Sequence, residues 1–121
     1  MKYMLLIYDE EKSFATMPPA EMGQLMADYR AFSEDLIKRG NHITSSQLQP
    51  ATSATSIRIR DGKRMVTDGP FAETREQLGG YYVVEAKDLD EAIEIAARIP
   101  SAKIGTIEVR PLMQASAPAT A

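Results

Sequence analysis

The chain has no cysteine, a single histidine and no surplus of positive charge, and each of these shortages excludes a class of function. Without cysteine there is no disulfide, no thiolate zinc site and no cysteine nucleophile. The net charge of −3 lacks the clustered Lys and Arg that neutralise nucleic-acid phosphates. No apolar run approaches the roughly 18 residues of a membrane span. We therefore expect neither a nucleic-acid partner nor a membrane partner.

The first twelve residues become acidic too soon for a signal peptide. Together with the lack of cysteine, this predicts a cytoplasmic protein. The length of 121 residues and the 44% of hydrophobic residues are typical of one globular domain. We expect this domain to span residues 1–113, and residues 114–121, which show no periodicity, to form a disordered tail.

Two segments have the apolar periodicity of helices that bury one face. Residues 20–39 follow two prolines and end before Gly40. Their apolar side chains recur every three or four positions and form one stripe, which consists of Met22, Leu25, Met26, Tyr29, Phe32, Leu36 and Ile37. Residues 89–99 follow Asp88, which together with Glu91 resembles a capping box. The buried stripe of this second helix is predicted to consist of Leu89, Ala92, Ile93, Ala96 and Ile99.

The remaining regular segments alternate as strands do. Residues 2–8 are apolar on both alternating faces, which suits a strand covered on two sides. Asp61-Gly62 is a two-residue hairpin turn, so residues 56–60 should pair with residues 63–68 in a fixed register. Residues 41–55 are irregular and are expected to hold only a short extended piece. Further strands are predicted at residues 80–86 and 105–110.

The order of these elements indicates the α+β fold class. If one hairpin strand is an addition, the chain reads β-α-β-β-α-β, the ferredoxin-like arrangement with both helices on one face of an antiparallel sheet. This arrangement leaves the other face of the sheet uncovered, in agreement with the two-sided apolar pattern of residues 2–8. We therefore expect a homodimer in which two copies pack sheet against sheet.

Asp68 is an unusual residue in this pattern. The hairpin register places it on the same side as Ile57, Ile59 and Val66, where a carboxylate is costly to desolvate unless it has a partner. It could accept backbone N–H groups of the turn that follows, or it could line a cleft at the edge of the sheet. The two interpretations are compatible, because a carboxylate held by a turn is also preorganised.

The segment VTDGPFAETREQLGGYYVVEAKDLDEA and the later GTIEVRPLM closely resemble the DGPF-type members of the YCII-related family. The resemblance implies a dimeric ferredoxin-like α+β barrel, the architecture of muconolactone isomerase-like proteins. For the wider family it implies a His/Asp active site, with one relative that dehydrochlorinates a hydroxylated aromatic ring. For some DGPF-type members it implies a link to extracytoplasmic-function sigma factors. The histidine that the wider family has on its first helix has no counterpart in residues 20–39.

The candidate catalytic residues are Asp68 and the single histidine, His42, which would act as an acid/base pair if they lay within roughly 3 Å. The candidate ligand-binding residues are Asp68, Phe71, Glu73, Arg75 and Tyr81. Each has a structural alternative: a lone loop histidine is often a surface residue, charged loop residues often form solvated ion pairs, and aromatic residues often belong to a core or an interface. Scattered carboxylates and one histidine show no metal-ligand spacing, so no metal site is expected.

Two functions remain open on this reasoning. The first is a cofactor-independent enzyme that acts on a small aromatic or anionic metabolite, with Asp68 as base or orienting group. The second is a noncatalytic regulatory module that binds a metabolite or a partner protein. No cofactor is expected in either case.

Overall fold

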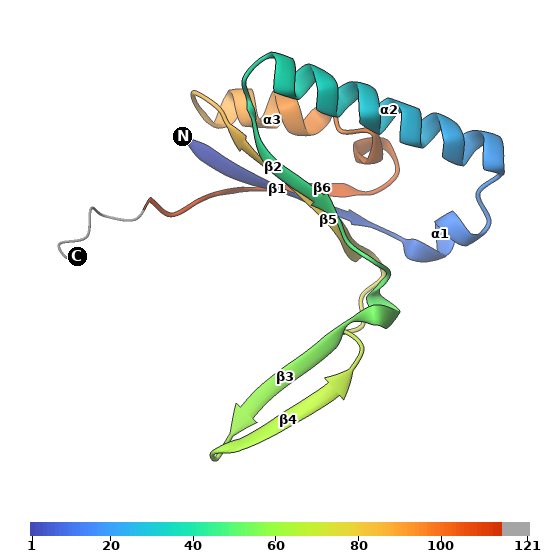
Figure 1. The fold of residues 1–121 in the computed structure, drawn as a ribbon, viewed down its shortest axis with the longest axis vertical. Helices are drawn as coiled ribbons and strands as arrows, with labels where there is room; N and C mark the ends of the chain where they lie inside the picture. The colour runs from blue at the N-terminus through green and yellow to red at the C-terminus, as the bar shows by residue number, and fades with distance from the viewer. Residues whose placement is uncertain (115–121) are drawn as a thin grey trace.

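The computed structural model describes residues 1–114, so the predicted tail at residues 114–121 lies outside the described residues apart from Gln114. Figure 1 shows a main sheet with α2 and α3 on one face and a separate two-stranded arm that projects away from it. No helix among residues 1–114 is long and apolar enough to cross a membrane. The elements are β1 (Lys2–Asp9), α1 (Glu11–Ala15), α2 (Pro19–Lys38), β2 (His42–Gln47), η1 (Ala51–Ser53), β3 (Thr55–Arg60), β4 (Lys63–Asp68), β5 (Gln77–Glu85), α3 (Leu89–Ala97), η2 (Pro100–Lys103) and β6 (Thr106–Pro111).

The main sheet has the strand order β2-β5-β1-β6, and each neighbouring pair is antiparallel. Helix α2 connects β1 to β2, and α3 connects β5 to β6. An antiparallel sheet with this order and with both long helices on one face is consistent with the ferredoxin-like α+β fold predicted from the sequence.

The hairpin of β3 and β4 forms with the predicted register, because Ile57 lies opposite Val66 and Arg60 opposite Lys63. The prediction that one of its strands belongs to the main sheet was wrong, since β3 and β4 form a two-stranded sheet of their own. The strand missing from the main sheet is β2, whose segment was expected to be mostly irregular. Its sequence, HITSSQ, is polar because β2 is an edge strand that pairs only with β5.

Helix α2 begins and ends within one residue of its predicted limits. The second half of its apolar stripe is used for packing, since Phe32 and Leu36 are buried against the sheet. Ile37, which the pattern also placed in the stripe, is 58% exposed. The first half of the stripe does not enter the core at all, and the space beneath it is described in the next subsection.

Helix α3 has the predicted cap and most of the predicted stripe. The Asp88 carboxylate accepts a hydrogen bond from the Glu91 N–H at 2.9 Å, as an N-cap residue does. Ala92 and Ala96 are buried as expected, but the helix is rotated relative to the predicted stripe. Leu89 and Ile93 are each 49% exposed, and Ile95 is buried instead.

Strand β1 has the predicted two-sided pattern. Tyr3, Leu5 and Ile7 are buried under the helices, whereas Met4, Leu6 and Tyr8 on the other face are only partly buried. The core that the helices cover consists of Tyr3, Leu5, Ile7, Phe32, Leu36, Tyr82, Val84, Ala86, Ala92, Ile95, Ala96 and Ile99.

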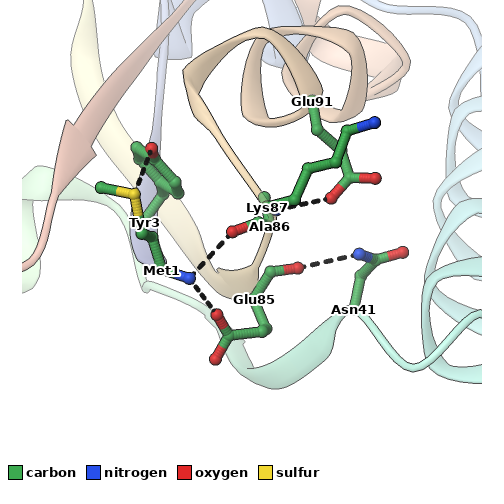
Figure 2. A network of polar contacts seen from close by, with 7 residues as sticks. All are labelled: Met1, Tyr3, Asn41, Glu85, Ala86, Lys87 and Glu91. Carbon is green, nitrogen blue, oxygen red and sulfur yellow. Dashed lines mark hydrogen bonds and ion pairs between the residues drawn. The ribbon is translucent and has the colours of Figure 1, made fainter.

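A polar network fixes the end of β5 (Figure 2). The Met1 amino group donates to the Ala86 carbonyl at 2.9 Å and also pairs with the Glu85 carboxylate. The Asn41 side-chain amide donates to the Glu85 carbonyl at 2.8 Å, and the Lys87 N–H donates to the Glu91 carboxylate at 2.8 Å. These contacts tie the end of β5 to the chain just before β1, to the chain just before β2 and to the first turn of α3.

Candidate functional site

A cavity of about 420 Å³ lies between α2 and the face of the sheet that the helices cover. This volume is within the range of small-molecule sites. Residues of β1, β2 and β5 form one wall, the first half of α2 forms the opposite wall, and α1 contributes Glu11 and Phe14. The α2 side chains are Met22, Leu25, Met26 and Tyr29. The lining is therefore mostly apolar, with a few polar groups at defined positions.

The cavity explains why α2 has a longer apolar stripe than its packing uses. Met22, Leu25 and Tyr29 are only partly buried, and Met26 is 38% exposed, although all four are on the stripe. Met22, Leu25 and Met26 are not part of the core and face the cavity, whereas Tyr29 both packs against the core and lines the cavity. An apolar surface of this kind is what a small hydrophobic ligand would cover.

Asp9, the last residue of β1, is the most unusual group in the cavity wall. Its side chain points to the same side as Tyr3, Leu5 and Ile7, and the residue is only 7% exposed. Among residues 1–114 no cation forms an ion pair with its carboxylate. Burial, followed by the negative charges of Glu11 and Glu76, raises the pKa of Asp9 to about 6.

Two glycines make room for Asp9. A Cβ atom at Gly79 would lie 3.2 Å from Asp9 Oδ1, and a Cβ atom at Gly105 would lie 3.1 Å from Asp9 Cβ and 2.2 Å from the Tyr8 carbonyl oxygen. Side chains at these two positions would therefore displace the carboxylate or the strand that carries it. The Gly79-Gly80 pair, which sequence alone marks only as the start of a strand, forms part of the site.

Tyr29 is a second polar group of the α2 wall. Its hydroxyl donates to Ser101 Oγ at 2.5 Å, and Ser101 is itself almost fully buried in η2. Burial is the main cause that raises the pKa of the Tyr29 hydroxyl, and the nearby Asp9 charge acts in the same direction. Tyr29 is thus held as a neutral phenol whose oxygen can still accept a hydrogen bond from a ligand.

Tyr82 closes the cavity on the β5 side. Its hydroxyl forms a 2.6 Å hydrogen bond with Ser33 Oγ of α2, and its ring packs edge-on against Phe32 with a centroid distance of 5.2 Å. His42 lies behind it, with ring centroids 6.2 Å apart. His42 Nε2 forms a 2.8 Å hydrogen bond with Ser45 Oγ of the same strand.

Of the residues proposed from sequence, only Tyr81 is among the cavity-lining residues. His42 does not line the cavity, although its ring lies next to that of Tyr82. Asp68 lies in the arm, exposed at the end of β4, and His42 lies in the main sheet, so no hydrogen bond joins this pair within residues 1–114. Phe71 is 80% exposed and Glu73 is exposed.

Arg75 is also outside the cavity. Its side chain is 91% exposed and lies 3.6 Å from the Glu10 carboxylate, which is an exposed ion pair of small energetic weight. The turn after Asp68 is held by the Gly69 N–H, which donates to the Ala54 carbonyl at 2.6 Å, and by the Ser56 hydroxyl, which donates to the Gly69 carbonyl at 2.8 Å. Neither bond uses the Asp68 carboxylate.

Asp9 and Tyr29 were not singled out from the sequence, although a signal for Asp9 was present. The alternation that places Tyr3, Leu5 and Ile7 inward puts Asp9 inward as well, if the strand is extended by one residue. The same alternation of side chains along residues 63–68 placed Asp68 on the apolar side of its strand. That strand, however, belongs to the exposed arm. Tyr29 was recognised as part of an apolar stripe, and its phenol gave no sign of facing a cavity.

A smaller cavity of about 280 Å³ lies on the other side of Asp9. It is lined by Asp9, Glu10, Phe14 and Glu21, with further residues of the α1–α2 connection and Ile104. Asp9 and Phe14 belong to both cavities. Residues 1–114 contain no group of three or more His, Asp or Glu side chains placed to hold a metal ion.

Comparison with known proteins identifies one family across nearly the whole chain. The family model for the YCII-related domain matches residues 1–116. A protein of Rhizobium meliloti (strain 1021), described as uncharacterized protein R00369, is 36% identical over 114 residues, which cover 93% of this chain and 92% of the relative. This similarity extends over all the elements that build the cavity.

Proposed function

The chain belongs to the YCII-related family, and we propose that it binds a small, largely aromatic or apolar molecule in the cavity beneath α2, with Asp9 at the polar end of that ligand. One observation carries this proposal. A carboxylate that is only 7% exposed and has no cationic partner within residues 1–114 lies in the wall of a cavity that is otherwise mostly apolar. Such an arrangement is costly for folding alone, and a ligand would supply the missing partner.

Asp9 also gives the site a chemistry that needs no cofactor. A carboxyl group with a pKa of about 6 exchanges its proton readily near neutral pH, as a general acid or base must do. We therefore propose a cofactor-independent enzyme that moves a proton on its ligand through Asp9. In this proposal Asp9 has the role that the sequence suggested for Asp68, and the Tyr29 hydroxyl accepts one hydrogen bond from the ligand beside it.

The binding site can be tested by filling it. Neutral aromatic fragments added to the wild-type protein should shift the amide NMR signals of Gly79, Gly80 and Ser101, because these residues line the cavity. The variant Met26→Trp places a large ring in the cavity and should weaken this binding about tenfold or more, a loss of ~1.4 kcal/mol. Ile37→Trp, at an exposed position of the same helix, is the matched control and should bind as the wild type does. Equal binding to Met26→Trp would contradict the proposal.

A noncatalytic regulatory module is the second candidate, and the arm supports it. Ile57, Ile59 and Val66 are 58% to 64% exposed on a hairpin that touches little of its own chain. Exposed apolar side chains on a projecting element are typical of a docking surface for another protein. For this candidate a regulatory partner, such as the sigma factors linked to DGPF-type relatives, would bind the arm. A bound ligand recovered chemically unchanged after incubation would favour this candidate over the enzyme.

We also propose the homodimer that the two-sided pattern of β1 suggests. The face of the sheet away from the helices carries Met4, Leu6, Tyr8 and Tyr81, which are partly buried and mostly apolar. A second copy packed on this face would remove their apolar surface from water and complete an α+β barrel.

A further inference from the structure

The charges around the cavity are all of one sign. Asp9 and Glu11 are cavity-lining residues, and none of the lining residues is Lys, Arg or His. Glu76 is close enough to add to the negative field at Asp9, and Glu10 and Glu21 line the smaller cavity on the other side. Arg75 is directed to Glu10 at the surface and does not line either cavity. An anionic ligand would be repelled here, whereas a cation would be attracted.

The aromatic residues add a second feature that suits a cation. Phe14, Tyr29 and Tyr82 are all among the lining residues. The faces of aromatic rings attract ammonium groups, most strongly where water is excluded. The Tyr29 hydroxyl, which donates its proton to Ser101, keeps oxygen lone pairs free to accept from an N–H donor.

We propose that the ligand of this cavity carries a protonated amine, and that the buried carboxylate of Asp9 is its counter-ion. This proposal rests on the proposed function and specifies the chemical class of the ligand. The amine would donate to Asp9 and Tyr29, and the apolar part of the ligand would lie along Met22, Leu25 and Met26. A metal ion is a poorer candidate occupant, because residues 1–114 do not bring three suitable ligands together.

The pairing predicts how binding depends on pH. Asp9 is faced by Glu11 of α1, by Glu76 before β5 and by the neutral Tyr29 of α2. No cation within residues 1–114 therefore holds it ionised in the free protein. A cationic ligand binds only the ionised form, and alkylamines are protonated throughout the range of pH 5 to 7. With a pKa of about 6 for Asp9, affinity should rise about tenfold from pH 5 to pH 7. In the complex Asp9 is then held as the carboxylate, the form that a general base requires.

The test uses three probes with the same ring and different charge: 2-phenylethylamine, 2-phenylethanol and phenylacetate. Calorimetric titration of the full chain should show the amine binding about tenfold more tightly than the alcohol, and phenylacetate more weakly than either. Asp9→Asn should reduce affinity for the amine about tenfold and leave that for the alcohol almost unchanged. Asp61→Asn removes the same charge at the exposed tip of the arm and is the matched control.

Three results would overturn the proposal, and they differ in what they say about the site. If the alcohol or phenylacetate binds at least as well as the amine, the cavity binds ligands but does not select amines. If Asp9→Asn and Asp61→Asn reduce amine affinity equally, the preference comes from net charge and not from Asp9. If none of the three probes binds, and neutral fragments shift no cavity amides, the proposed function fails together with the amine preference.

Discussion

At the scale of one residue, the buried carboxylate of Asp9 lowers the stability of the fold when it is ionised, although the proposed ligand site needs it. Its pKa is raised from 3.8 to about 6, so the folded protein binds this proton more tightly than the unfolded chain does. The resulting contribution to stability is complete below about pH 4 and is lost as the pH rises through about 6. Above that pH the ionised carboxylate costs the fold ~3 kcal/mol, at about 1.4 kcal/mol per pH unit.

Asp9→Asn should therefore stabilise the protein at alkaline pH. We expect its free energy of unfolding to exceed that of the wild type by ~2 to 3 kcal/mol at pH 8, because the amide has no charge to desolvate. The difference should become small near pH 4 and vanish below the unfolded-state pKa of 3.8, where Asp9 is protonated in both states. Urea denaturation of both proteins at the two pH values measures it.

Other carboxylates titrate in the same range, so the comparison uses the difference between the two proteins. Asp35 and Glu108, for example, have lowered pKa values caused chiefly by hydrogen bonds from arginines, and their contribution changes in the opposite direction. Asp61→Asn should give the stability of the wild type at both pH values. A variant at position 9 that is no more stable than the wild type at pH 8 would show that Asp9 is better solvated, or better paired, than its burial indicates.

At the scale of secondary-structure elements, the site depends on how closely β2 and β5 approach each other at Gly80. A Cβ atom there would lie 2.9 Å from the Ser46 carbonyl oxygen, which is a backbone atom and cannot move without β2. The two strands pair from His42 opposite Val84 to Gln47 opposite Gly80. The close approach therefore sets the position of the cavity wall that β2 contributes.

Gly80→Ala should destabilise the protein by ~1 to 3 kcal/mol, because overpacking forces backbone shifts of this cost. Gly23→Ala on α2 is the matched control, since a Cβ atom there meets nothing within 4 Å. It should stabilise by ~1 kcal/mol through helix propensity alone. Urea denaturation of the two variants at one pH gives both values. Two variants of equal stability would mean that β2 moves freely relative to β5.

Most helices and strands were predictable from the sequence. The way in which the strands assemble into sheets was less predictable. The α2 stripe, the Asp88 cap and the hairpin register depend on neighbouring residues, so local patterns specify them. Strand β2 was missed because an edge strand exposed to solvent needs no apolar alternation. The exposure of Asp68 was missed because its parity was correct within the hairpin, while only tertiary structure determines that the hairpin leaves the main sheet.

The candidate site was less predictable than the elements for a related reason. The cavity lies where the apolar stripe of α2 continues beyond the core. The sequence pattern of such a stripe is the same whether the helix packs on side chains or forms the wall of a cavity. Tyr29 and Met26 therefore read as core residues. Asp9 could have been found by extending one alternation, but its pairing with Gly79 and Gly105 depends on contacts distant in the sequence.

At the scale of the whole molecule, two apolar surfaces could form the interface of the proposed homodimer. They are the open face of the main sheet and the arm. We expect sedimentation of the wild type to give a dimer at micromolar concentration. Leu6→Lys, in the open face, should give a monomer, because it buries a charge in the interface. Ile59→Lys, in the arm, should leave the dimer intact. If Ile59→Lys is monomeric and Leu6→Lys is still a dimer, the interface lies in the arm. A monomeric wild type would exclude both surfaces as a dimer interface.

The arm leaves and rejoins the domain at neighbouring points. The Leu48 N–H donates to the Gly79 carbonyl at 2.9 Å, and the Gly69 N–H donates to the Ala54 carbonyl at 2.6 Å. Each of these two hydrogen bonds joins the chain before the arm to the chain after it. Neither strand of the arm belongs to the main sheet. Changes confined to the hairpin at residues 55–68 therefore leave the lining residues of the cavity unchanged. Relatives with one common pocket could thus acquire different partners through this hairpin alone.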